Sequence, residues 1–129
     1  FPRWMHAALW KAKQPYNVNV AATAAALGSL ADLEERSATV ELLRQERERL
    51  FEVLSTTRFL RPIPSQANFI LCRVLDRPAK RLKEQLARRG VLLRYYETSL
   101  LSGYIRASVG RPGDTAALAA ALAEVEAEA

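Results

Sequence analysis

The sequence predicts an α+β fold, in which helices cover one face of a small sheet. Residues 33–56 carry apolar side chains at helical spacing on one side and charges on the other. Residues 68–75, NFILCRVL, form an apolar run typical of a buried strand. Two further short apolar runs, 91–96 and 104–110, follow a charged, helix-like segment. This order predicts a mixed or antiparallel sheet of three to four strands, preceded by helices.

Two helices are expected before this region. Residues 3–13 have the spacing of a helix with one apolar face, and Pro15 ends it, because the residue before a proline avoids the α conformation. Asn17 or Asn19 can cap a second, alanine-rich helix that runs to about Leu30.

Asp32 is expected to cap the long helix over residues 33–56. Its apolar side is predicted to cover the sheet and comprises Val40, Leu43, Leu50, Val53 and Leu54. Its charged side is predicted to face solvent and comprises Arg44, Glu46, Arg47, Glu48 and Arg49.

Turn and cap residues divide the rest of the chain. The prolines of FLRPIPSQ indicate a short strand and a turn, and Pro78 suits the first turn of a helix over residues 78–89. Gly90 can end that helix in the left-handed conformation, and Asp114 is expected to begin the last helix.

Composition limits the classes of function. The chain has 129 residues, the size of one domain, with 19 basic and 14 acidic residues and a net charge of +5. Basic residues alternate with acidic ones and form no tail, which argues against a nucleic-acid-binding protein. No apolar run reaches the roughly 20 residues of a membrane span. The single cysteine, Cys72, excludes an internal disulfide and is expected to be a buried thiol.

Two arginines in apolar strands are the strongest functional signal. Arg94 lies in GVLLRYY and Arg106 in GYIRASVG. A guanidinium keeps its charge and is costly to bury alone, so two of them close together indicate a clamp for a carboxylate or phosphate. The alternative is that each arginine lies on the solvent side of an edge strand. Alternation places Arg106 on one face of its strand and Ile105 and Ala107 on the other.

Other catalytic groups are scarce in the sequence. His6 is the only histidine, and no cluster has the spacing of a metal site. The lysines lie on charged helix faces rather than in apolar pockets and are Lys11, Lys13, Lys80 and Lys83. The chain alone therefore shows no evident nucleophile, general base or metal ligand set.

Three segments together carry a resemblance to a known family. They are LWKAKQPYNVNVAA (9–22), PSQANFILCRV (64–74) and GVLLRYYETSLLSGYIRASVGRP (90–112). In this order they resemble the C-terminal part of the histidinol-phosphate aminotransferases, which are pyridoxal-phosphate enzymes of fold type I, class I/II. The resemblance implies that residues 1–30 are a remnant of the large cofactor-binding domain with the interdomain helix. Residues 31–129 would then be the small C-terminal domain.

The resemblance also implies roles for individual residues. Arg106 matches the family arginine that holds the substrate α-carboxylate, and Arg94 matches a second substrate-binding arginine. Tyr16 matches a tyrosine near the phosphate end of histidinol phosphate, whereas Asn68 and Phe69 are expected to be structural. The family's Schiff-base lysine and the other cofactor-binding residues have no counterpart in this sequence. The chain alone is therefore expected to be inactive and to bind pyridoxal phosphate poorly.

The resemblance implies a parent enzyme of histidine biosynthesis. It would exchange an amino group between glutamate and imidazole-acetol phosphate, so its expected partners are a small amino-acid phosphate substrate and glutamate or 2-oxoglutarate. The parent is expected to be a homodimer in the bacterial cytoplasm or in a plastid, without nucleic-acid or membrane partners. The alternatives are a threonine-phosphate decarboxylase, an aromatic aminotransferase, or a non-enzymatic basic interaction domain.

Overall fold

A computed structural model of the protein describes residues 2–13 and 16–128. The chain divides into two compact units, Phe1–Ser37 and Ala38–Ala129, each with its own internal contacts. The sequence had suggested a division after residue 30. The assignment of the first unit to a larger domain stays a prediction.

The first unit is helical. A 3₁₀ turn, Arg3–Met5, precedes α1, His6–Ala12, and α2 follows over Val20–Ala31. Of the two expected caps, Asn19 caps α2, because its Oδ1 accepts a hydrogen bond from the N–H of Ala22 at 2.8 Å. The predicted role of Pro15 in ending the first helix lies outside the described residues.

The apolar side chains of the first unit remain exposed. Trp4 is 80% exposed, and Trp10, Val20 and Leu27 are also exposed. The apolar face predicted for residues 3–13 is therefore not buried within the described part of this unit.

Helix α3, Leu33–Thr56, has the predicted bounds. Asp32 is the expected cap, with its Oδ1 accepting a hydrogen bond from the N–H of Glu35 at 3.0 Å. The predicted apolar side is only partly correct: Leu50 and Leu54 are buried, whereas Val40 and Leu43 are exposed. Only the C-terminal part of α3 reaches the core, because the sheet is shorter than the helix.

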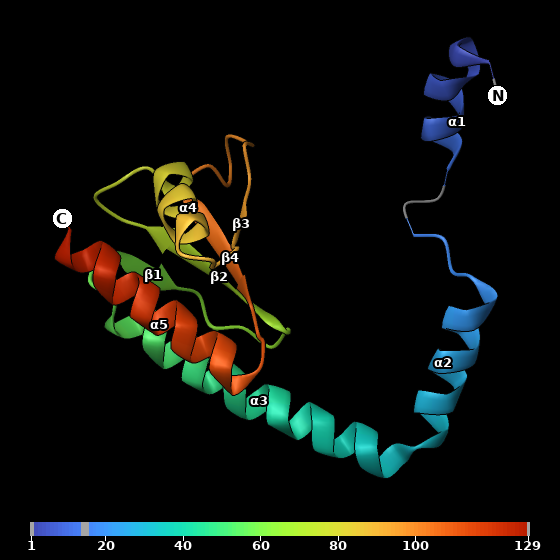
Figure 1. The fold of residues 1–129 in the computed structure, drawn as a ribbon, viewed down its shortest axis with the longest axis horizontal. Coiled ribbons are helices and arrows are strands. Elements are labelled where there is room, and N and C mark those ends of the chain that lie inside the picture. The colour runs from blue at the N-terminus through green and yellow to red at the C-terminus, as the bar shows by residue number, and fades with distance from the viewer. Residues whose placement is uncertain (1, 14–15, 129) are drawn as a thin grey trace. The chain divides into compact units, whose positions relative to one another are not determined.

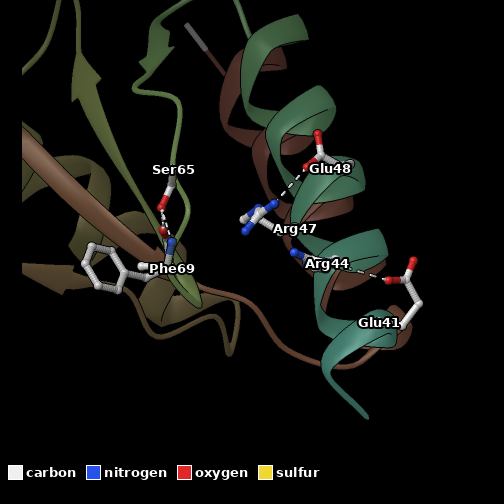
Figure 2. A network of polar contacts seen from close by, with 7 residues as sticks. Glu41, Arg44, Arg47, Glu48, Ser65 and Phe69 are labelled. Carbon is white, nitrogen blue, oxygen red and sulfur yellow. Dashed lines mark hydrogen bonds and ion pairs between the residues drawn. The ribbon is translucent and has the colours of Figure 1, made fainter. Parts of the chain in front are cut away.

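The charged side of α3 also differs from the prediction. Glu46 and Arg47 each have only 13% of their side chains exposed. Glu46 accepts a hydrogen bond from the hydroxyl of Thr115 at 3.0 Å. Figure 2 shows Arg47 projecting from α3 toward the segment that carries Ser65 and Phe69. These two charged residues therefore lie at packed contacts rather than in open solvent.

Four antiparallel strands form the sheet, in the order β1-β2-β4-β3. Their bounds are Leu60–Pro62, Phe69–Val74, Arg94–Tyr95 and Tyr104–Ser108 for β1, β2, β3 and β4. The prediction of a strand over 91–96 was too long. Val91 donates its N–H back to the carbonyl of Leu86 at 3.0 Å, so this residue still belongs to the end of the preceding helix.

Helices α4, Ala79–Arg88, and α5, Pro112–Ala127, pack with the end of α3 against one face of the sheet (Figure 1). The core between them takes every second residue of the strands and the inward side chains of the helices. Its strand members include Ile70, Cys72, Val74, Ile105 and Ala107. Because one face of the sheet is filled in this way, the side chains between them in β2 and β4 point to the other face, here called the open face. The predicted α+β class is confirmed.

Two helix ends correct the sequence-based expectations. Helix α5 begins at Pro112 rather than Asp114, and the Asp114 carboxylate accepts a hydrogen bond from the N–H of Arg111 at 2.8 Å. Pro78 precedes the first residue of α4 instead of lying within its first turn. Gly90 has a φ of +80°, which confirms its expected left-handed conformation after α4. Among the described residues, no helix has the length and apolar character needed to cross a membrane.

Candidate functional site

Arg94 and Arg106 lie directly opposite each other on neighbouring antiparallel strands. The register pairs Arg94 of β3 with Arg106 of β4, and Leu71 of β2 with Arg106 on its other side. Opposite residues in such a pair have Cα atoms about 4.5–5.5 Å apart and project to the same face. The strand pairing therefore brings the two predicted anion-binding residues together.

Both arginines belong to the open face. In β4, Ile105 and Ala107 are buried, whereas Tyr104 and Arg106 are half-buried and Ser108 is exposed. This alternation is the one predicted from the sequence. Arg94 is exposed. The pair is thus separated from the core by the sheet and is accessible within this unit.

The positive charge of the pair is uncompensated. Within the described residues, neither guanidinium takes part in an ion pair. The Nε atom of Arg106 is buried without a hydrogen-bond partner. Like charges at opposite positions of a strand pair are destabilising, and each guanidinium has the donor geometry to bind a carboxylate or phosphate. That this pair binds an anion stays a prediction.

Aromatic rings lie beside both guanidinium groups. The Cζ atom of Arg106 is 5.0 Å from the ring centre of Phe69, and that of Arg94 is 5.5 Å from the ring centre of Tyr96. The negative face of an aromatic ring attracts a cation at these distances. From the sequence, Phe69 was expected to be structural and Tyr96 had no predicted role. Phe69 and Arg106 are 37 residues apart in the chain, so only the β2–β4 pairing reveals their contact.

A second pair of arginines extends the charge of the open face. Arg61 of β1 lies opposite Arg73 of β2, and Arg73 lies opposite Tyr104 of β4. Both arginines are exposed. Neither arginine was predicted from the sequence to have a functional role, and only the strand register shows that they lie opposite each other.

Tyr16, the third residue predicted to bind substrate, belongs to the first unit and is 87% exposed. The structure thus brings together Arg94 and Arg106, and the participation of Tyr16 stays a prediction.

The potential nucleophiles in the described chain lie in unsuitable surroundings. Burial raises the pKa of the Cys72 thiol to about 12, so the thiol stays neutral. Lys80 forms an ion pair with Glu97 at 2.9 Å, and the hydrogen bond that its ammonium donates to the carboxylate raises the pKa of the lysine and lowers the pKa of the carboxyl. A nucleophilic lysine needs the opposite shift. No cluster of metal-ligating residues occurs in residues 2–13 and 16–128.

The sequence also matches a family model, that of the aminotransferases of class I and II, over residues 2–124. The chain belongs to this family, whose members depend on pyridoxal phosphate.

Individual relatives are more specific. The chain is 50% identical over 119 residues to the chloroplastic histidinol-phosphate aminotransferase of Nicotiana tabacum, covering 92% of the chain and 29% of that protein. It is 48% identical over 120 residues to the histidinol-phosphate aminotransferase of Roseiflexus castenholzii, covering 91% of the chain and 32% of that protein. The chain thus spans about three tenths of the length of these curated relatives.

Solved structures have the same fold. The histidinol-phosphate aminotransferase of Clostridium acetobutylicum superposes with a TM-score of 0.78 at 28% identity, covering 95% of this chain and 38% of that one. The enzyme of Sinorhizobium meliloti, in complex with pyridoxal-5'-phosphate, gives a TM-score of 0.71 at 26% identity, covering 84% and 30%. The recognition of this family from the three sequence segments is confirmed.

The described residues do not fit a site for the cofactor itself. Pyridoxal phosphate is held as a Schiff base by a lysine in a sheltered pocket. Here Lys11, Lys13 and Lys80 are exposed, and Lys83 is half-buried on the charged helix α4. The arrangement on this chain is suited to gripping an anion and offers no lysine for the cofactor.

Proposed function

We propose that this chain is the substrate-gripping portion of a histidinol-phosphate aminotransferase. That enzyme would transfer an amino group between glutamate and imidazole-acetol phosphate in histidine biosynthesis. The names of the most similar relatives support this assignment, and so does their length, because the chain covers only about three tenths of each. The activity therefore belongs to a longer protein that contains this segment.

The pairing of Arg94 with Arg106 carries the proposal. A guanidinium binds a carboxylate through two parallel hydrogen bonds, which fixes the direction as well as the position of the substrate. In this assignment Arg106 holds the α-carboxylate of glutamate. Arg94 binds a further negative group of the substrate, and Tyr16 lies near the phosphate end of histidinol phosphate.

The cofactor supplies the electron sink of the reaction when it is bound elsewhere in the enzyme. The role of this chain is to orient the substrate and to help exclude water. Fixing the reacting groups in the correct geometry lowers the barrier by several kcal/mol in favourable cases, roughly 7–11 kcal/mol at the limit. Two guanidinium groups on a small sheet can provide that orientation without taking part in bond making.

Two further properties follow from the same assignment. The parent enzyme is expected to be a homodimer. Its compartment is expected to be the bacterial cytoplasm or a plastid, since its relatives include bacterial and chloroplastic proteins.

Substrate profiling of the full-length protein tests the proposal. Amino transfer from glutamate to imidazole-acetol phosphate is expected to have the highest kcat/KM. The comparison set is decarboxylation of threonine phosphate and amino transfer to aromatic 2-oxo acids. A higher kcat/KM for either of these would replace the proposed substrate with another within the same family.

The isolated 129-residue chain provides a second test. With added pyridoxal phosphate, glutamate and imidazole-acetol phosphate it is expected to show no transamination above background. Turnover by this chain would refute the proposal that the activity requires a longer protein. A mobility shift with generic DNA or RNA that weakens as salt rises would instead favour a basic interaction domain.

A further inference from the structure

The contact between Phe69 and Arg106 joins two strands of the open face. Phe69 lies opposite Ser108, and Arg106 lies opposite Leu71, so Phe69 and Arg106 are diagonal neighbours across the β2–β4 pair. Diagonal neighbours lie within reach of aromatic and long side chains. The ring centre of Phe69 is 5.0 Å from the Cζ atom of Arg106.

The atoms of Arg106 differ in their exposure. Its Nε is buried and has no hydrogen-bond partner. Neither Nη group is among the buried unpartnered atoms of the described chain, and neither makes an ion pair there. An anion therefore meets this guanidinium at its Nη end. The aromatic face of Phe69 is the group within the described residues that offsets the charge of Arg106 before a ligand arrives.

Hydrogen bonds also fix the backbone around Phe69, at the start of β2. The hydroxyl of Ser65 donates to the carbonyl of Phe69 at 2.6 Å (Figure 2). The same hydroxyl accepts a hydrogen bond from the N–H of Ala67 at 3.1 Å. The carbonyl of Asn68 accepts from the N–H of Val109 at 2.9 Å. Val109 directly follows β4, so the backbone that carries Phe69 is hydrogen-bonded to the end of the strand that carries Arg106.

We propose that Phe69 is a positioning residue for substrate binding. Its ring holds the Arg106 guanidinium so that the Nη end points outward for the carboxylate. This inference rests on the proposed function, because it assigns Arg106 to substrate binding. It adds to that function an effect of Phe69 on the affinity for the substrate carboxylate, through the electrostatics of its ring. From the sequence, Phe69 was expected to be only structural.

Replacing Phe69 in the full-length protein by mono-, di- and trifluorophenylalanine tests this inference. Fluorination weakens the negative face of the ring in steps and changes its shape little, so the series separates electrostatics from packing. The probe is 2-methylglutamate, which keeps the α-carboxylate but has no Cα–H bond to break, and its Kd is measured by calorimetry. The Kd is expected to rise with each fluorine, because the ring then holds the guanidinium less firmly in its binding orientation. The rise for the trifluoro variant is at most about two- to thirtyfold, the factor to which the whole cation–π energy converts when the contact is made only in that orientation.

Three controls make the outcome decisive. The cofactor absorbance band is expected to stay unchanged across the series, and the melting temperature to fall by no more than a few degrees, because a contact of the folded state is weakened. The monofluoro and difluoro variants still give a slope if the trifluoro variant does not fold. Arg73→Gln removes an exposed charge from the same face and is expected to leave the Kd unchanged. If Arg73→Gln weakens binding as much as fluorination does, the effect is one of general charge and the inference is wrong.

Arg106→Gln separates this inference from the proposed function. If Arg106→Gln weakens binding strongly while the fluorinated series binds like the wild type, Phe69 has only a packing role and the proposed function stands. If Arg106→Gln binds 2-methylglutamate like the wild type, the assignment of Arg106 fails and this inference fails with it.

Discussion

Arg94 and Arg106 face each other across the β3–β4 pair with no acidic partner among the described residues. Such a pair of like charges lowers the stability of the unliganded fold. Arg94→Gln is therefore expected to raise the free energy of unfolding in urea by about 0.2–1 kcal/mol at low salt. The gain should shrink in 1 M salt, because screening already weakens the repulsion in the wild type. A loss of stability at low salt would show that Arg94 has a structural partner instead.

The end of α3 is expected to be essential for the core. Leu54 is fully buried, whereas Leu42 on the same helix is 63% exposed. Leu54→Ala should lower the free energy of unfolding by about 2–5 kcal/mol, because it removes buried methyl groups and leaves a cavity. Leu42→Ala is the matched control and should change it by less than about 0.5 kcal/mol. Urea denaturation of both variants measures the difference, and equal effects would contradict the packing described for α3.

Gly90 and Gly113 should respond to alanine in opposite ways. Gly90 has a φ of +80°, and a Cβ atom there meets no other atom within 4 Å, so the cost is conformational alone. Gly90→Ala should therefore destabilise by roughly 1–2 kcal/mol. Gly113 lies in the first turn of α5, also with open space around it. Gly113→Ala should be neutral or stabilising by up to about 1 kcal/mol. Thermal melts of the two variants check the signs.

Cys72 is expected to be unreactive in the folded protein. Burial raises the pKa of its thiol from the ordinary value of 9.0 to about 12, so the neutral form is favoured on folding. This contribution to stability is fully present below pH 9 and is lost as the pH rises toward 12. At pH 8 a disulfide reagent should label the thiol only as fast as the chain unfolds, and urea should accelerate the reaction. Labelling at the rate of a free cysteine peptide would contradict the burial of β2.

The sequence predicted correctly those features of the fold that depend on neighbouring residues in the chain. Asp32 caps α3, and Gly90 takes the left-handed conformation after α4. The strand predicted over 91–96 was too long, because the N–H of Val91 donates a hydrogen bond to the carbonyl of Leu86. Whether this bond forms depends on how α4 ends. The burial of Glu46 was also missed, since its partner Thr115 lies 69 residues away.

In the candidate site, too, local features were predictable from the sequence and contacts between distant segments were not. Alternation within one strand placed Arg106 correctly on the face opposite Ile105. Its position opposite Arg94 depends on the register between strands, which a long connecting turn does not determine. The contact with Phe69 needs the pairing of segments distant in the chain, so spacing alone could not reveal it.

The most direct test of the account is the effect of Arg106→Gln on amino transfer by the full-length protein. Losing a charged partner of a substrate carboxylate costs about 2–5 kcal/mol, so kcat/KM for glutamate should fall at least about thirtyfold. Arg73→Gln, on the same face, should leave kcat/KM within about twofold of the wild type, as expected for an exposed arginine that touches no substrate. An Arg106→Gln enzyme with the kcat/KM of the wild type would contradict the claim that this arginine grips the substrate.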